Sequence, residues 1–101
     1  MPKMKIEIPH DGIVQFCHKW KVKELSLFGS VLRDDFRPDS DVDVLVEFEL
    51  ESPWSLFDFV DMMDELKAIF GRKVDLVEKG GLRNPFRRHS ILTTREVVYA
   101  A

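Results

Sequence analysis

The sequence predicts one small α/β domain, residues 1–101, in which a mostly three-stranded mixed sheet is packed against helices. Three short runs rich in strand-forming residues fall at 25–28, 41–48 and 73–77. Before and between them lie stretches whose apolar residues recur every three or four positions, the spacing of an amphipathic helix. A chain of 101 residues has room for one domain, so these elements must share one core.

Charge and cysteine content narrow the class of protein. The formal net charge is −3, which argues against a protein that coats nucleic acid, because such binding needs a cationic surface. The one cysteine, Cys17, excludes an internal disulfide, and on an apolar helix face it is expected to be core rather than nucleophile. No secretory signal or membrane-length apolar segment is apparent. We therefore expect a cytoplasmic protein without membrane or direct nucleic-acid binding.

The first third of the chain predicts a helix followed by a strand. Asp11 is the expected N-cap of the helix, whose apolar face carries Ile13, Phe16, Cys17 and Trp20. The first strand ends abruptly at Gly29-Ser30, and a short helix is expected over 31–35 before Pro38 stops it.

The second strand shows a clear two-residue alternation. One face is wholly apolar and comprises Val42, Val44, Val46 and Phe48. The other face is mostly acidic and comprises Asp41, Asp43, Leu45 and Glu47. The sequence therefore predicts that this strand buries one face and presents carboxylates on the other.

A long helix and a third strand follow. Ser52-Pro53 is expected to start the helix, and Gly71 to end it. The predicted core stripe of this helix is Leu56, Val60, Met63, Leu66 and Phe70. The third strand, 73–77, alternates apolar residues with Asp75. Residues 82–101 give weaker signals and are expected to form one or two helices.

Two carboxylates on one strand face favour a cation. The side chains of Asp41 and Asp43 leave the same face roughly 6–7 Å apart. Carboxylates at this spacing repel one another unless a cation lies between them, and Mg²⁺ prefers oxygen ligands. A solvated strand face is the alternative, and Asp39 with Asp41 is a rival pair. Because Asp39 follows Pro38 in a turn, we expect it to precede the strand.

Two further features agree with a site for a metal and phosphates. A strand that ends in Gly29-Ser30 and opens a short helix presents backbone N–H groups to an anion. Asp75 is a charge within an apolar strand, and a neighbouring position in the sheet would bring it to Asp41 and Asp43. The alternative for Asp75 is an edge-strand charge that discourages aggregation.

The run LFGSVLRDDFRPDSDVDVLVEF, residues 27–48, resembles the signature of the polymerase-β-type nucleotidyltransferase superfamily. Gly29-Ser30, ten intervening residues and Asp41-Val42-Asp43 carry the resemblance, which is closest to the minimal nucleotidyltransferases (MNT). These are antitoxin partners of HEPN-domain ribonuclease toxins. Asp34 departs from the pattern, because many relatives have glycine there.

The resemblance implies a site and a reaction. Asp41, Asp43 and Asp75 would bind Mg²⁺, and Asp75 would also activate the acceptor hydroxyl. The triphosphate of ATP would contact Gly29, Ser30 and Arg33. The implied reaction transfers AMP from ATP to a tyrosine of the HEPN toxin and releases pyrophosphate.

Other functions stay open at the level of sequence. A non-catalytic antitoxin could neutralise the toxin by direct occlusion, whereas a small-molecule or RNA-end acceptor is disfavoured by length and acidity. The chain is about the size of the bare catalytic core, so the acceptor is expected on another protein. Candidate contacts, or else scattered surface hydrophobes, are Trp54, Phe57, Met62 and Phe86. The C-terminal cluster of Arg83, Arg87, Arg88 and His89 is interpreted as a solvated helix face, with a binding patch as the alternative.

Overall fold

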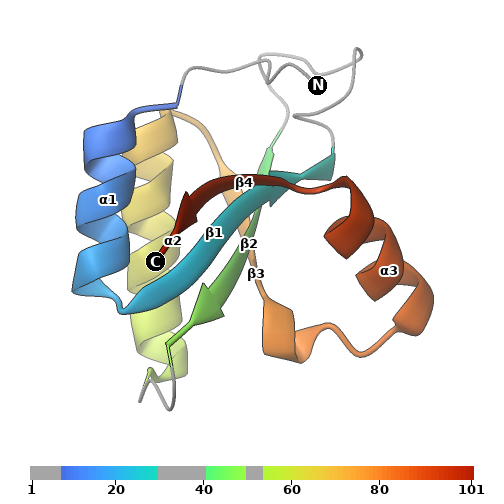
Figure 1. Ribbon diagram of the computed structural model, residues 1–101. Helices are drawn as coiled ribbons and strands as arrows, with labels where there is room; N and C mark the ends of the chain where they lie inside the picture. The colour runs from blue at the N-terminus through green and yellow to red at the C-terminus, as the bar shows by residue number, and fades with distance from the viewer. Residues whose placement is uncertain (1–7, 30–40, 50–53) are drawn as a thin grey trace.

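The computed structural model describes residues 8–29, 41–49 and 54–101. Along these residues the helices are interspersed with the strands of the sheet (Figure 1). The elements are α1 (His10–Lys19), β1 (Val22–Phe28), β2 (Val42–Phe48), α2 (Leu56–Phe70), β3 (Val74–Glu78), the 3-10 turn η2 (Lys79–Gly81), α3 (Pro85–Thr94) and β4 (Glu96–Ala100).

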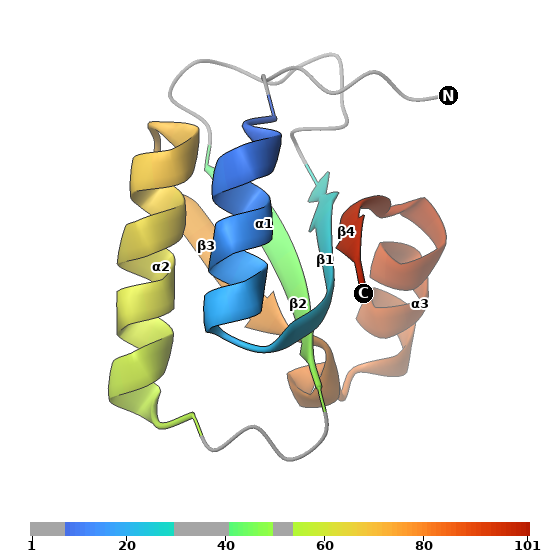
Figure 2. The ribbon, with the colours of Figure 1, turned by 60° about the vertical axis from the view of Figure 1, so that its left-hand side comes forward.

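The strands form one mixed sheet in the order β3-β2-β1-β4. β1 pairs antiparallel with both β2 and β4, whereas β2 and β3 run parallel. α1 and α2 lie side by side on one face of the sheet, and α3 lies on the other (Figures 1 and 2). The predicted α/β fold class is therefore confirmed, with helices on both faces of the sheet.

The sheet has four strands among the described residues rather than the three predicted. Residues 82–101, predicted as helix only, form α3 and then β4. β4 completes the sheet by pairing with β1, more than sixty residues away in the chain, with Ser26 opposite Val97 and Leu25 opposite Tyr99. This pairing depends on tertiary contact, which overrides weak local preference in a five-residue segment.

The main core lies between the sheet and the helices α1 and α2. Val42, Val44 and Val46 are fully buried there, which confirms the predicted apolar face of β2. They pack with Ile13 of α1 and Leu66 of α2. The opposite face of the sheet carries a smaller cluster under α3, formed by Phe28, Leu45, Leu82 and Ile91. The sheet therefore has an apolar cluster on each of its two faces.

Two predicted helix starts were wrong. α1 is capped at Pro9 without a side-chain hydrogen bond, and Asp11 lies in its first turn. α2 begins at Leu56, because Ser55 and Asp58 form a reciprocal capping box. The Ser55 hydroxyl accepts from Asp58 N at 3.2 Å, and Ser55 N donates to the Asp58 carboxylate at 2.9 Å. The Ser52-Pro53 pair lies outside the described residues.

The predicted core stripe of α2 was partly wrong. Met62 and Leu66 are fully buried, whereas Leu56 is 80% exposed and Val60 is 45% exposed. Met62 was a candidate contact for a partner, and its burial removes it from that set. The helix ends as predicted, with Gly71 in the left-handed region at φ 72°.

The sequence also predicted a short helix and no membrane-spanning segment. The short helix expected over 31–35 lies outside the described residues. Among the residues that the structure does describe, no helix combines the length and the apolar character needed to cross a membrane.

Candidate active site

The parallel pairing of β2 and β3 brings two of the predicted carboxylates together. Asp43 and Asp75 are Cα partners in the register of these strands. Side chains of directly paired residues leave the same face of a sheet, so both carboxylates project to the face that also carries α3. Asp41 lies two residues before Asp43, and the backbone beside it is fixed because Val42 N donates to Lys73 O at 2.9 Å.

Gly29 lies directly against this carboxylate pair. It follows the last residue of β1, Phe28, which pairs with Asp43. Its φ of +74° is in the left-handed region, and a Cβ built at this position would collide with Oδ2 of Asp43. Only glycine lets the backbone turn here while the Asp43 carboxylate stays in place. The turn and the acidic strand face are therefore one local structure.

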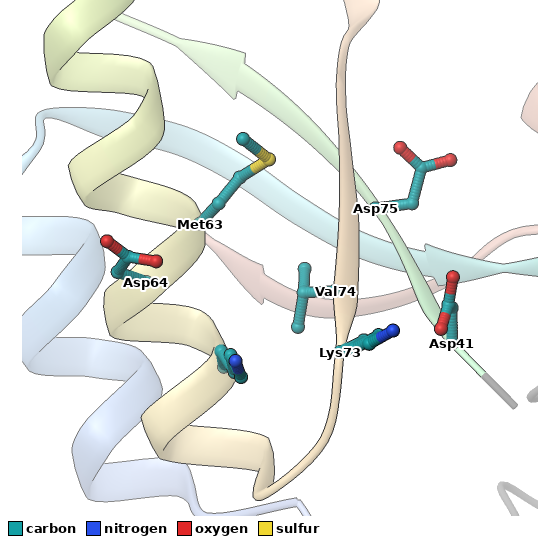
Figure 3. Close-up of a pocket in the computed structure, with 7 residues that line it drawn as sticks. Asp41, Met63, Asp64, Lys73, Val74 and Asp75 are labelled. Atoms are coloured by element: carbon teal, nitrogen blue, oxygen red, sulfur yellow. The ribbon is translucent and has the colours of Figure 1, made fainter. Parts of the chain in front are cut away.

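A hollow of about 330 Å³ adjoins the carboxylates and is here called the β3 hollow. Figure 3 shows Asp41, Lys73 and Asp75 on one side of β3, while Val74 points to the other side, toward α2. The residues that line the hollow are Asp41, Met63, Asp64, Lys67, Lys73, Val74 and Asp75. The hollow therefore reaches from the carboxylate face around β3 to α2.

The structure places four of the six predicted site residues. Gly29, Asp41, Asp43 and Asp75 converge from the ends of β1, β2 and β3. Ser30 and Arg33, together with Asp34 and Asp39, lie outside the described residues. Asp41 and Asp43 each have a further interaction partner, so neither is a free carboxylate in this structure.

The donor chemistry of these residues fits a hard divalent cation. Carboxylate oxygens are the ligands that Mg²⁺ selects. Asp43 of β2 and Asp75 of β3 each supply a carboxylate, and Asp41, directly before β2, supplies a third. Within the described ranges, no three His, Cys, Asp or Glu side chains are close enough to form a metal cluster. The fit of these residues to a divalent ion therefore rests on their donor chemistry.

Two lysines in the β3 hollow were not singled out by sequence. Lys73 lies two residues before Asp75, so strand alternation alone puts both on one face. Lys67 comes from α2, and only the packing of α2 against β3 brings it to the hollow. The position of Lys73 could therefore have been predicted from the sequence pattern, whereas that of Lys67 could not.

Cys17 is not suited to nucleophilic chemistry. Burial in the core under α1 raises the pKa of its thiol to about 12. A thiol with that pKa is almost wholly protonated near neutral pH and so lacks the reactive thiolate. The prediction that Cys17 is a core residue is confirmed.

The fold and the candidate site define a class of protein: a nucleotidyltransferase, in which strand-borne carboxylates lie beside a glycine turn. Residues 13–98 match the family model of the nucleotidyltransferase domain, so the chain belongs to that family. This match confirms the resemblance seen in residues 27–48, and the enzyme class is that of a nucleotidyltransferase.

Several proteins of known type are similar to this chain. Protein adenylyltransferase MntA of Thermococcus cleftensis is 42% identical over 81 residues, which is 80% of this chain and 77% of the relative. A toxin–antitoxin crystal structure with AMP-PNP superposes with a TM-score of 0.73 at 17% identity, over 92% of this chain and 74% of that chain.

A second solved complex contains a tri-AMPylated HEPN toxin of Shewanella oneidensis with its MNT antitoxin. It superposes with a TM-score of 0.60 at 18% identity, over 91% of this chain and 70% of that chain. At such identities the two solved structures establish the shared fold.

Proposed function

We propose that this chain is an antitoxin that transfers AMP from Mg²⁺-bound ATP to a tyrosine of a cognate HEPN ribonuclease toxin. The relative from Thermococcus cleftensis is named a protein adenylyltransferase, and its match spans most of both chains. A protein of the same fold is complexed with a HEPN toxin that carries three AMP groups. These two similarities support ATP as the donor of AMP and a HEPN toxin as the acceptor.

The observation that carries the proposal is the register of β2 and β3. It pairs Asp43 with Asp75 on one face, while Gly29 contacts Asp43 from the next strand. Without a role in binding, two directly paired carboxylates would be an unfavourable arrangement, because like charges directly opposite destabilise a sheet. A bound cation and a triphosphate give the arrangement a function.

Each residue has a proposed role. Asp41, Asp43 and Asp75 would hold the divalent ion, and Gly29 with Ser30 and Arg33 would contact the triphosphate. When bound, the ion supplies positive charge that neutralises the phosphate oxygens as charge develops. The left-handed turn at Gly29 lets the backbone approach a phosphate without interference from a side chain.

The proposed reaction is a single displacement at the α-phosphorus of ATP. The tyrosine hydroxyl oxygen attacks that phosphorus, and the bond from the α-phosphorus to the oxygen of the β-phosphate breaks. The hydroxyl proton passes to the carboxylate of Asp75, and pyrophosphate leaves with the electron pair of the broken bond. The products are a tyrosine–AMP phosphodiester and pyrophosphate.

Neutralisation by occlusion is the second candidate. It is favoured by large apolar side chains that the chain leaves exposed, of which Phe57 is 82% exposed and Phe86 is 85% exposed. Such side chains are typical of the buried centre of a protein–protein contact. In this case the toxin would be blocked only while the complex persists.

Intact mass spectrometry of the toxin tests the choice. A cognate HEPN ribonuclease is incubated with ATP, Mg²⁺ and a substoichiometric amount of this chain. The proposal expects a gain of one or more AMP masses on more toxin molecules than there are antitoxin molecules. It also expects the toxin to stay inactive after the antitoxin is removed, because a phosphodiester does not depend on a bound partner.

Asp75→Asn is the matched variant for this test. The substitution keeps the size of the side chain but removes its ability to accept a proton, so the mass gain should be lost while the complex still forms. Unchanged toxin mass with complete, stoichiometric inhibition by the wild-type chain would replace the proposal with occlusion.

A further inference from the structure

We propose that the outer edge of β3 is the docking strand for the acceptor, which adds to the sheet as an extended polypeptide segment. This inference rests on the proposed function, because it names how a protein acceptor reaches the candidate site. Strand addition gives affinity through backbone hydrogen bonds, while side-chain positions next to the edge give specificity.

β3 lies at the end of the sheet order β3-β2-β1-β4, so one of its two edges faces β2. No other strand pairs with its second edge within residues 8–29, 41–49 and 54–101. The opposite end of the sheet is β4, and the candidate carboxylates are on β2 and β3 instead. The free edge next to Asp75 is therefore the one adjacent to the proposed reaction.

The orientation of the backbone groups of β3 follows from one hydrogen bond. Because Lys73 O accepts from Val42 N at 2.9 Å, the backbone of Lys73 faces β2. Successive residues of a strand direct their backbone groups to opposite edges, so those of Asp75 and Val77 also face β2. The backbone groups of the alternate residues, Val74, Leu76 and Glu78, face the outer edge.

The β3 hollow makes this edge reachable. Its lining includes Lys73, Val74 and Asp75 from β3 itself, and α2 residues on the far side of the strand. Figure 3 shows that Val74 and Asp75 project to opposite sides of β3, so a space lined by both must pass the strand edge. A hollow of about 330 Å³ at this place leaves room for a chain to approach the strand.

Strand pairing would also orient the acceptor side chain. Residues directly opposite each other on paired strands project to the same face. A residue of the added segment opposite Asp75 therefore lies on the face that carries the carboxylates of Asp75 and Asp43. A tyrosine at this position would have its side chain on the side of the sheet where the proposed proton acceptor lies.

The charges along this edge have a competing explanation. Lysine and acidic residues on an edge strand hinder the addition of another strand, and Lys73, Asp75 and Glu78 fit that pattern. The β3 hollow, however, contains both signs of charge, with Lys67 and Lys73 beside three aspartates. A docked segment with charged side chains can therefore form ion pairs with these groups, so the charges along this edge do not exclude strand addition.

Amide hydrogen exchange followed by NMR tests the proposal residue by residue. The isotope-labelled chain is measured alone and in complex with the cognate HEPN protein. In the free chain the amides of Val74 and Glu78 should exchange fast, and Asp75 and Val77 slowly, because the latter face β2. On binding, the outward amides should slow by about tenfold or more, while the inward amides change little.

A matched pair of variants isolates the backbone hydrogen bond. Glu78 has φ −85° and ψ 134°, a conformation that proline tolerates, and its N–H faces outward. Glu78→Pro and Glu78→Ala both remove the charge, but only proline removes the N–H donor. Glu78→Pro should bind the HEPN protein about fivefold more weakly than Glu78→Ala, the effect of one lost hydrogen bond. A thermal melt of both variants shows whether each is folded.

The outcomes separate this inference from the proposed function. Equal affinity of the two folded variants, and a complex in which the outward amides exchange as fast as before, would overturn the docking strand. The edge charges would then be protection against aggregation. AMP transfer is measured independently by toxin mass, so transfer without edge protection rejects only the docking mode. Edge protection without transfer rejects only the reaction.

Discussion

Two glycines with nearly the same backbone conformation differ in what surrounds them. Gly29 has φ +74° and Gly71 has φ +72°, both in the left-handed region that side chains rarely adopt. A Cβ at Gly71 would meet no atom within 4 Å, whereas a Cβ at Gly29 would collide with the Asp43 carboxylate. Gly71 ends a helix, and Gly29 makes room for a candidate ligand side chain.

This difference predicts unequal effects of alanine. Gly71→Ala should cost about 1 kcal/mol, the strain of a left-handed alanine. Gly29→Ala should cost more, because the collision with Asp43 adds to the same strain. Urea unfolding of both variants measures the two values. In a Gly29→Ala, Asp43→Ala double variant, part of the excess should disappear since the colliding oxygen is gone. Equal costs for the two glycine variants would contradict the contact with Asp43.

At single positions, strand alternation accounts for most of what the sequence predicted. It placed Asp41 and Asp43 on the face opposite the buried valines, and the structure confirms this arrangement. The parallel register that pairs Asp43 with Asp75 depends on the path of the chain between the two strands, so it could only be supposed. From the sequence, Gly29 was interpreted as a position where a phosphate can approach the backbone closely. Its proximity to the Asp43 carboxylate follows only from the three-dimensional structure.

On the scale of elements, α2 shows how tertiary packing selects among apolar residues. The helical period fits several stripes, and the sequence favoured one that included Leu56 and Val60. The structure instead buries Met62, because the face of α2 that meets α1 and the sheet includes this side chain. Phe57, five residues earlier and so on another face of the helix, is 82% exposed. A periodic pattern predicts a helix with more certainty than it predicts which face is buried.

Truncating these two side chains, Met62 and Phe57, should have very unequal effects on the stability of the free chain. Met62→Ala leaves a cavity in the core and should reduce the free energy of unfolding by about 2–5 kcal/mol. Phe57→Ala removes an exposed side chain and should change the stability of the free chain by no more than about 0.5 kcal/mol. Thermal or chemical denaturation measures both. A large loss for Phe57→Ala would mean that this ring packs against the chain itself.

The last strand and the helix caps depend on interactions that local sequence patterns do not reveal. β4 is five residues long and pairs with β1, one of the two inner strands, so its stability depends on a partner distant in sequence. Ser52-Pro53 matched the preferred pattern for a helix start as well as Ser55 did. The reciprocal hydrogen bonds between Ser55 and Asp58 decide the start, and two such signals three residues apart are hard to rank from sequence.

For the whole molecule, a small core makes stability sensitive to ligands. A domain of this length buries a limited share of its surface, so its margin of stability is small. A ligand that binds only the folded chain adds to that margin by mass action. At a hundredfold excess over its dissociation constant the gain is about 2.7 kcal/mol. In a 101-residue domain this raises the melting temperature by roughly 10 °C or more.

We therefore expect Mg²⁺ and ATP together to raise the melting temperature of the wild-type chain, and ATP with excess chelator to raise it much less. The reason is that the paired carboxylates repel a triphosphate unless a cation lies between them. Asp43→Asn preserves the shape of the side chain and removes one ligand charge, so the variant should melt close to the wild type without ligand. It should then gain little from Mg²⁺ and ATP. Equal shifts for ATP with ion and with chelator would contradict the metal-bridged site, whereas an unfolded Asp43→Asn chain would assign Asp43 to the structure of the sheet.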